Sequence, residues 1–348
     1  MDGYLSEEST VQSGVPQGSV LGPILFLIHI ADIDANLDYA VASSFADDTR
    51  LAMGVRGNVD RCKLQEDMNK IYDWALLNNM QFNGAKFEML RYVPSTTGEN
   101  YTYEAPGNIP IKQSQAVRDL GIIMQNDATF AKQIDKMVEK GSVQAGWVLR
   151  TFATREAKPL LILYKALVLP HLEYCSQLWS PEGIGNIRKL ENVQRGFTAR
   201  IISVREIDKR EQLKKFKLYS LERRRDRYTI LYIYKIISGL VPNFQDERFK
   251  IEIRENERLG RYCRIPSIQT RSTCRVKNLV DSSFAVRGAR LFNALPKDMR
   301  NFTGSYESFK SKLDKLLEIV PDKPLIPGYQ SQNVQSNCLA HQISHINL

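Results

Sequence analysis

Two adjacent aspartates, Asp47 and Asp48, restrict the possible structure of this chain more than any other feature of its sequence. Residues 39–53 place β-branched, aromatic and small side chains on both sides of the pair, a pattern that predicts a β-hairpin. Neighbouring side chains on a strand point to opposite faces. Two adjacent carboxylates therefore serve one site most easily at the turn of that hairpin, where the alternation breaks down.

Adjacent carboxylates repel each other, and a bound cation relieves that repulsion. Carboxylate oxygens are hard ligands that suit Mg²⁺ or Mn²⁺, and Mg²⁺ is commonly held by one or two carboxylates together with substrate phosphates. Paired metal ions stabilise both oxygens of an in-line phosphoryl displacement, so the pattern indicates nucleotidyl transfer. An Asp-Asp pair is also common in solvated turns, and the dipeptide alone does not distinguish the two interpretations.

The surrounding motifs favour the catalytic interpretation. The run Gly14-Val15-Pro16-Gln17-Gly18-Ser19, followed by the Phe45-Ala46-Asp47-Asp48 segment, resembles reverse transcriptases of LINE-type retrotransposons that lack long terminal repeats. Segments 80–86, 117–122, 163–175 and 190–195 resemble, in order, the next palm motif, the primer grip and the thumb of jockey-like elements. Even 291–296 and 308–310 resemble the end of such reading frames. The likeness covers most of the chain, and four palm motifs in the family's order are specific.

The resemblance implies roles for individual residues. Asp47 is the metal ligand that bridges both ions and Asp48 assists it, while Lys86 lies near the nucleotide phosphates as a third catalytic group. A second group shapes the pocket for nucleotide and template, and Leu120 and Gly121 form the primer grip on a strand that closes the palm. The pocket group consists of Gln17, Gly18, Ser19 and Phe45, and the expected partners are an RNA template, a DNA primer and deoxynucleotide triphosphates.

In this family a third carboxylate comes from a motif upstream of the Gly-Val-Pro-Gln-Gly segment. The acids before Gly14 are Asp2, Glu7 and Glu8, and none stands in such a motif. We therefore expect a truncated domain that lacks the fingers and the first catalytic aspartate. Because two-metal catalysis tolerates little misplacement of its carboxylates, we expect the isolated chain to have little or no polymerase activity.

The expected fold is α+β: a partial polymerase palm, with an antiparallel sheet and packed helices, precedes a mainly helical thumb. A short strand should cover residues 5–13. An apolar helix should begin after Ser19, reach about Asp34 and be buried, and an amphipathic helix should cover residues 58–79. In the thumb, further helices should cover residues 128–149, open near Pro159, and cover 182–203 and 221–237. The predicted boundaries are 1–125 for the palm, 126–240 for the thumb, 241–320 for a mixed basic region, extended over 261–276, and 321–348 for a disordered tail.

The charge of the chain is distributed unevenly. The net charge is +9, yet residues 1–60 contain two arginines against nine acids. Two basic clusters lie downstream, at 205–227 with ten Lys or Arg against five acids and at 248–277 with nine against three. Such clusters suit phosphate contacts, and within the first we select Arg223, Arg224 and Arg225 as nucleic-acid contacts. Ordinary solvated helix faces remain an alternative interpretation.

Five cysteines without close CxxC spacing, and an N-terminus without a signal-like pattern, favour a cytoplasmic or nuclear protein that is neither secreted nor membrane-bound. Two alternatives to a polymerase stay open. One is a catalytically dead remnant that binds nucleic acid, and the other is a helical interaction protein with no nucleic-acid role. Nucleic-acid binding that weakens steeply with salt is expected of the polymerase and of the remnant, but not of the interaction protein.

Overall fold

The computed structural model describes residues 14, 18–92, 101–202, 207, 209–258, 260–266, 274–324 and 337–345. The chain divides into two compact units, residues 1–117 and 118–348, and each is considered by itself. Both combine helices with small strand pairs, which confirms the predicted α+β class. The short strand expected over residues 5–13 falls outside the described residues.

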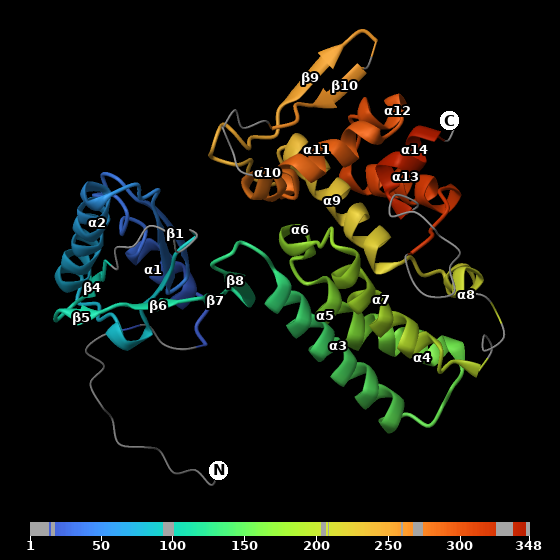
Figure 1. Cartoon of the computed structure of the whole chain (residues 1–348), viewed down its shortest axis with the longest axis horizontal. Coiled ribbons are helices and arrows are strands. Elements are labelled where there is room, and N and C mark those ends of the chain that lie inside the picture. Colours follow the sequence, from blue (N-terminus) through green and yellow to red (C-terminus); the bar gives the residue numbers. More distant parts are fainter. Residues whose placement is uncertain are drawn as a thin grey trace. The chain divides into compact units, whose positions relative to one another are not determined.

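The first unit consists of short strands beside one long helix (Figure 1). Strand pairs β1–β2 and β4–β5 are antiparallel, whereas β3 and β6 run parallel. The elements are α1 (Gly22–His29), β1 (Val41–Phe45), β2 (Asp48–Ala52), α2 (Asn58–Leu77), the 3₁₀ turn η1 (Gly84–Lys86), β3 (Glu88–Leu90), β4 (Glu104–Ala105), β5 (Ile109–Pro110) and β6 (Lys112–Ser114).

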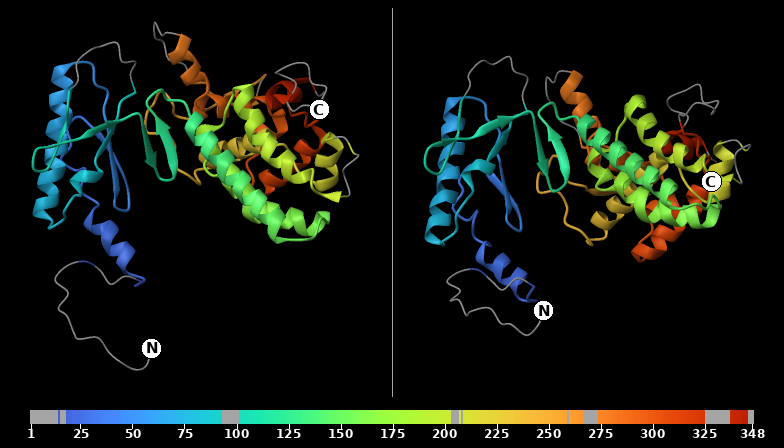
Figure 2. Two further views of the ribbon diagram at one scale, coloured as in Figure 1. Left: turned by 60° about the horizontal axis from the view of Figure 1, so that its bottom comes forward. Right: turned by 90° about the horizontal axis from the view of Figure 1, so that it is seen from below.

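Helix α2 supplies the core of this unit, as its amphipathic pattern predicts. Ile71, Trp74 and Ala75 pack against Ile30 and Ile33, which follow α1. On the neighbouring stripe of the helix, Met68 and Tyr72 pack against Tyr103, Ala105 and Ile111, which lie in or next to the short strands β4 to β6. The ring of Tyr72 lies edge-on to both Phe82 and Phe87. Figure 2 shows α2 running alongside the strands that it covers.

Helix α1 departs from its prediction. It ends at His29 rather than near Asp34, and most of its apolar side chains are exposed, with Ile28 at 67%. The prediction of a buried helix is therefore wrong for this structure. The run is apolar on every side, so periodicity could not show which face packs, and only Gly22 and the half-buried Phe26 on the helix, with Ile30 just beyond it, turn inward.

The second unit is mainly helical. A hairpin, β7–β8, leads directly into the helices, and a second hairpin, β9–β10, follows later in the chain (Figure 1). The elements are β7 (Ala116–Asp119), β8 (Ile122–Gln125), α3 (Ala131–Thr151), α4 (Ala157–Leu163), the π-helical turn η2 (Tyr164–Val168), α5 (Leu169–Glu173), α6 (Ser176–Trp179), α7 (Ile184–Thr198), α8 (Lys209–Phe216), α9 (Leu221–Ile237), β9 (Ile253–Asn256), β10 (Gly260–Cys263), α10 (Cys274–Asp281), α11 (Phe284–Ala294), α12 (Lys297–Arg300), α13 (Tyr306–Ile319) and α14 (Leu339–His345).

One hydrophobic core joins β8, α3, α5 and α7, with Leu172, Trp179 and Leu190 almost fully buried. Helices α3 and α5 approach closely at Gly141, where a Cβ atom would stand 2.6 Å from a methyl carbon of Leu172. The wide π-helical turn precedes Pro170, which has no N–H to continue the regular ladder. The helices expected near 128–149 and 182–203, and one opening near Pro159, are present.

A second core joins α9, α11, α13 and α14. Phe309 stacks on Tyr234 with ring centres 3.9 Å apart. The amide of Asn293 bonds both the N–H and the carbonyl of Cys263, at 2.7 and 2.8 Å. These contacts give packing reasons for the motifs at 291–296 and 308–310.

Two local predictions are wrong for part of their residues in this unit. Residues 337–345 of the tail expected to be disordered contain α14, which buries Leu339 and Ile343. In the stretch 261–276, expected to be extended, residues 261–263 do lie in β10, residues 267–273 fall outside the described part of the chain, and residues 274–276 form the first turn of α10 instead. In the tail, two apolar residues one helical turn apart suffice to dock a short helix on α11, a signal too small to outweigh the polar composition around them.

Candidate functional site

The two adjacent acids lie at the tip of the β1–β2 hairpin, as the sequence predicts. Ala46 and Asp47 form the two-residue turn, and Asp48 pairs with Phe45 across the strands. Ala46 has a positive φ of 51°, the type of backbone conformation that tight hairpin turns require. Behind the turn, the hydroxyl groups of Ser44 and Thr49 are 3.0 Å apart.

Both carboxylates are exposed, and no other side chain in the described residues engages them. Exposed, unpaired carboxylates are hard oxygen donors available to a divalent cation. Within the described residues, no group of three or more His, Cys, Asp or Glu is placed to hold a metal ion. The donor chemistry of the pair therefore fits Mg²⁺ or Mn²⁺ as two ligands of a site, with water and substrate phosphates as the remaining ones.

The aromatic residue of the motif is not packed against the protein. Phe45 ends β1 with 64% of its surface exposed, beside the acidic turn. Gln17 lies outside the described residues. Gly18 has a φ of +83°, and the Ser19 hydroxyl accepts a hydrogen bond of 3.0 Å from the N–H of Gly22, where α1 begins. The Ser19 side chain thus bonds the first residue of α1, while Leu21 occupies the N-cap position.

Lys86 is the last residue of η1, separated from β3 by Phe87, and is exposed. The Asn83 side chain accepts from the N–H of Ala85, and the Asn83 carbonyl accepts from the N–H of Lys86 at 2.9 Å. Asn83 therefore fixes the turn that presents Lys86, three residues further along the chain.

Leu120 and Gly121 form the turn of the β7–β8 hairpin, so the prediction that they lie on a strand is wrong. Both have positive φ, of 43° and 86°, as a two-residue hairpin turn demands. The Tyr174 hydroxyl donates a 3.0 Å hydrogen bond to the Leu120 carbonyl, and its ring lies against Gly121. The Trp179 indole N–H in turn holds the Tyr174 carbonyl at 2.7 Å.

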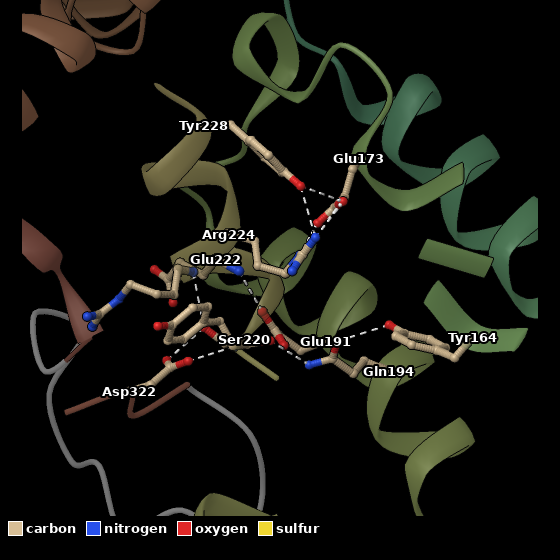
Figure 3. A network of polar contacts seen from close by, with 11 residues as sticks. Tyr164, Glu173, Glu191, Gln194, Ser220, Glu222, Arg224, Tyr228 and Asp322 are labelled. Atoms are coloured by element: carbon tan, nitrogen blue, oxygen red, sulfur yellow. Dashed lines mark hydrogen bonds and ion pairs between the residues drawn. The ribbon is translucent and has the colours of Figure 1, made fainter. Parts of the chain in front are cut away.

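The three arginines selected as nucleic-acid contacts are not available to phosphates. Arg223 and Arg225 are 0% and 2% exposed, and Arg224 is bound by Glu173 and Tyr228. That prediction is wrong because these side chains belong to a buried polar layer around the start of α9. Figure 3 shows part of this layer, with Arg224 directed at Glu173 and Tyr228. The cluster at 248–277 is also partly self-neutralised, since Arg248 pairs with Asp246, and Arg264 with Glu252.

The buried polar layer contains acids as well. Glu191 on α7 accepts a hydrogen bond of 2.8 Å from the N–H of Glu222, and burial raises the pKa of Glu191 to about 8 although nearby Arg225 opposes the shift. Gln194 on the same helix links Tyr164 to the carbonyl of Tyr219. This layer of hydrogen bonds and charges connects α7, which belongs to the first core, with the start of α9, which continues into the second.

Sequence reasoning missed one residue close to the acidic hairpin, Asp67. Its side chain is fully buried, and it accepts hydrogen bonds from three consecutive backbone N–H groups just before β1. The available signal was its place in α2, beside Met68 and one turn before Ile71, where the helical period puts a charged residue on the buried face.

Comparison with known proteins agrees with this geometry. Residues 1–124 match the family model for reverse transcriptase (RNA-dependent DNA polymerase). The N-terminal part of the chain is therefore similar to the reverse transcriptases. No solved structure gives a significant match.

The chain is also similar to named polymerases of mobile elements. It is 26% identical over 212 residues to the probable RNA-directed DNA polymerase from transposon X-element of Drosophila melanogaster, covering 57% of this chain and 22% of that protein. It is 25% identical over 212 residues to the RNA-directed DNA polymerase from mobile element jockey of the same species, covering 58% and 23%. The resemblance to jockey-like elements is thus confirmed, and the chain spans about a fifth of the length of these relatives.

No described helix combines the length and the apolar composition that crossing a membrane requires.

Proposed function

We propose that the first unit supplies the metal-binding part of a palm for RNA-directed DNA polymerisation. The observation that carries this proposal is the exposed Asp47-Asp48 pair at a hairpin tip, inside a segment that matches the reverse transcriptase family. In the proposed reaction, the 3′-hydroxyl of a primer attacks the α-phosphorus of a deoxynucleotide triphosphate, and pyrophosphate leaves. Bound divalent ions would stabilise the attacking and leaving oxygens.

The protein's own residues have distinct tasks in this proposal. Asp47, in the turn itself, would be the carboxylate that holds both ions, and Asp48 would assist it as the second ligand. Exposed Phe45 offers a flat apolar surface to the nucleotide beside the acids, and Lys86 presents an ammonium to the phosphates. Leu120 and Gly121, in a turn held by Tyr174, guide the primer.

Loss of metal binding tests the acidic pair directly. Replacing Asp47 with Ala removes one of two ligands, so we expect Mn²⁺ affinity to fall by about tenfold or more. Titration of the full chain with Mn²⁺, followed by the electron paramagnetic resonance signal of free Mn²⁺, measures this. Asp34→Ala removes an exposed acid outside the hairpin and should change nothing. Equal affinities of wild type and Asp47→Ala would contradict the proposal.

We further propose that helix α3 carries the nucleic-acid contacts first assigned to Arg223, Arg224 and Arg225. Positions 132, 136, 140, 143 and 147 share one exposed face and are occupied by three lysines, a valine and a tryptophan. Trp147 is 46% exposed, which suits stacking on a base or sugar. Lys132 and Lys140 have no acidic partner among the described residues, whereas Lys136 pairs with Glu139.

Salt dependence of binding tests the α3 face. The double variant K132Q/K140Q removes two cations, so the slope of log affinity against log salt for a primer–template duplex should become shallower by about 2. The matched control R248Q/K250Q removes two cations already paired with Asp246 and Glu247, and should leave the slope unchanged. If R248Q/K250Q makes the slope shallower and K132Q/K140Q does not, the interface lies on the C-terminal region instead. Binding that does not depend on salt at all would exclude a nucleic-acid role.

A further inference from the structure

One stripe of helix α2 holds the chain segment that leads into the acidic hairpin. Lys63, Asp67, Lys70 and Trp74 recur every three or four residues and therefore face the same side of the helix. The Trp74 indole N–H donates to Asp32 at 3.1 Å. The Lys70 ammonium lies 2.5 Å from Asp38, and Lys63 lies over the ring of Tyr39, 4.8 Å from its centre.

Asp67 makes the closest set of contacts in this stripe. One of its oxygens accepts from the N–H of Asp38 at 3.1 Å. The other accepts from Tyr39 at 2.8 Å and from Ala40 at 2.7 Å. Strand β1 begins at the next residue, Val41. Three backbone groups in succession thus converge on one fully buried carboxylate, which fixes both the position and the direction of the chain as it enters the hairpin.

The hairpin itself has few other attachments. It is a separate two-stranded sheet, and most of its side chains are exposed on both strands. Leu51, near the end of β2, is its partly buried hydrophobic contact with the cores around α2. A two-stranded hairpin is marginally stable alone. The orientation of its tip therefore depends on how its two ends are held, and Asp67 holds the entering end.

We propose that Asp67 is a positioning residue for the metal site: by fixing the backbone of residues 38–40 it sets where the hairpin presents Asp47 and Asp48. The consequence for metal binding rests on the function proposed above. Asp67 touches neither metal nor nucleotide in this role. Burial would raise the pKa of Asp67, but the hydrogen bonds from Ala40, Asp38, Tyr39 and Lys70 outweigh it and lower the pKa, so the carboxylate stays ionised at neutral pH.

Two measurements on the full chain test the inference. Hydrogen exchange, read by mass spectrometry, reports the order of hairpin amides 41–52, and Mn²⁺ titration reports the metal site. Asp67→Asn keeps the shape of the side chain but replaces one acceptor oxygen with a donor, so we expect hairpin exchange to accelerate about tenfold or more and Mn²⁺ affinity to fall about tenfold. Amides of α2 should keep their protection.

The matched control is Asp73→Asn, the same chemical change at an exposed position of the same helix, which should leave both readouts as in wild type. Asp67→Glu retains two acceptor oxygens and should restore part of the protection. If Asp67→Asn loses protection throughout α2, the variant has disturbed the helix itself, and Lys70→Met is tested in its place. Lys70→Met removes the ammonium partner of Asp67 but keeps the three backbone hydrogen bonds. It should accelerate hairpin exchange to a smaller extent.

The possible outcomes separate the two proposals. Unchanged hairpin exchange in both Asp67→Asn and Lys70→Met overturns the positioning inference. Accelerated exchange with unchanged Mn²⁺ affinity also overturns it, because the hairpin would then not need to be fixed. If wild type binds no Mn²⁺ at the hairpin but exchange accelerates in Asp67→Asn, the proposed metal site fails while the structural effect of Asp67 on the hairpin stands.

Discussion

Replacing Arg224 with Ala is expected to destabilise the folded chain by about 3 kcal/mol, because it leaves a largely buried carboxylate without its partner. Glu173 on α5 grips the Arg224 guanidinium with both oxygens, and one of the two contacts measures 3.0 Å. Tyr228 completes the group, since its hydroxyl accepts from Arg224 at 2.9 Å and donates to Glu173 at 3.2 Å (Figure 3). The side chains of Arg224 and Glu173 are 20% and 13% exposed.

Chemical denaturation of single and double variants measures this effect. In a cycle with Glu173→Gln, the double variant E173Q/R224A should be little less stable than R224A, because both changes remove the same interaction. The control Arg248→Ala removes an exposed guanidinium bound by Asp246, two residues away, and should cause no measurable loss. A stable R224A variant whose affinity for a primer–template duplex falls would instead restore the nucleic-acid role first inferred from the sequence.

The case of Arg224 shows what a basic cluster in a sequence does not reveal. Ten cations between positions 205 and 227 predict a positive surface, but the partner of Arg224 lies 51 residues away, on a different helix. Which cations meet distant acids depends on how α5, α7 and α9 pack, and no local pattern contains that information. The helices themselves were predictable, since α9 coincides with its predicted limits at Leu221 and Ile237.

The acidic hairpin was predictable for the opposite reason. Strand-forming residues on both sides of the acids define the hairpin locally. The structure adds the register, in which Phe45 pairs with Asp48 and the turn consists of Ala46 and Asp47. The turn at Leu120 and Gly121 was not predictable from the sequence. A leucine with a positive φ is unfavourable on its own, and this turn forms because Tyr174 holds it. Asp67 lay inside a correctly predicted helix, but its three backbone partners come from a segment that has no regular structure.

The free energy of unfolding should fall as pH rises from about 6 to about 8, because Glu191 binds a proton more tightly in the folded chain than in the unfolded one. Burial raises its pKa to about 8, against roughly 4.3 in an unfolded chain. Arg225, the cation that opposes this shift, is 2% exposed and shares no hydrogen bond with Glu191 among the described residues. Asp226 acts in the same direction, since burial raises its pKa to about 7.

The sign follows from proton binding. Between the unfolded and folded pKa values the folded state holds more protons, so stability is greatest below the unfolded value and is lost as pH rises through the folded one. One such group contributes up to about 1.4 kcal/mol per pH unit. Glu191→Gln keeps an oxygen that can accept from the N–H of Glu222 and removes the titrating proton, so it should flatten the profile and make the protein more stable than wild type at pH 8.

Denaturant unfolding at pH 5, 6, 7 and 8 gives both profiles. The control Glu211→Gln alters an exposed acid paired with Lys214 and should follow the wild-type curve. A wild-type profile that rises from pH 6 to 8, or one that Glu191→Gln leaves unchanged, would mean that Arg225 compensates the Glu191 charge fully. In that case the layer joining the two helical cores would be a closed ion pair, and its stability would be independent of pH across the physiological range.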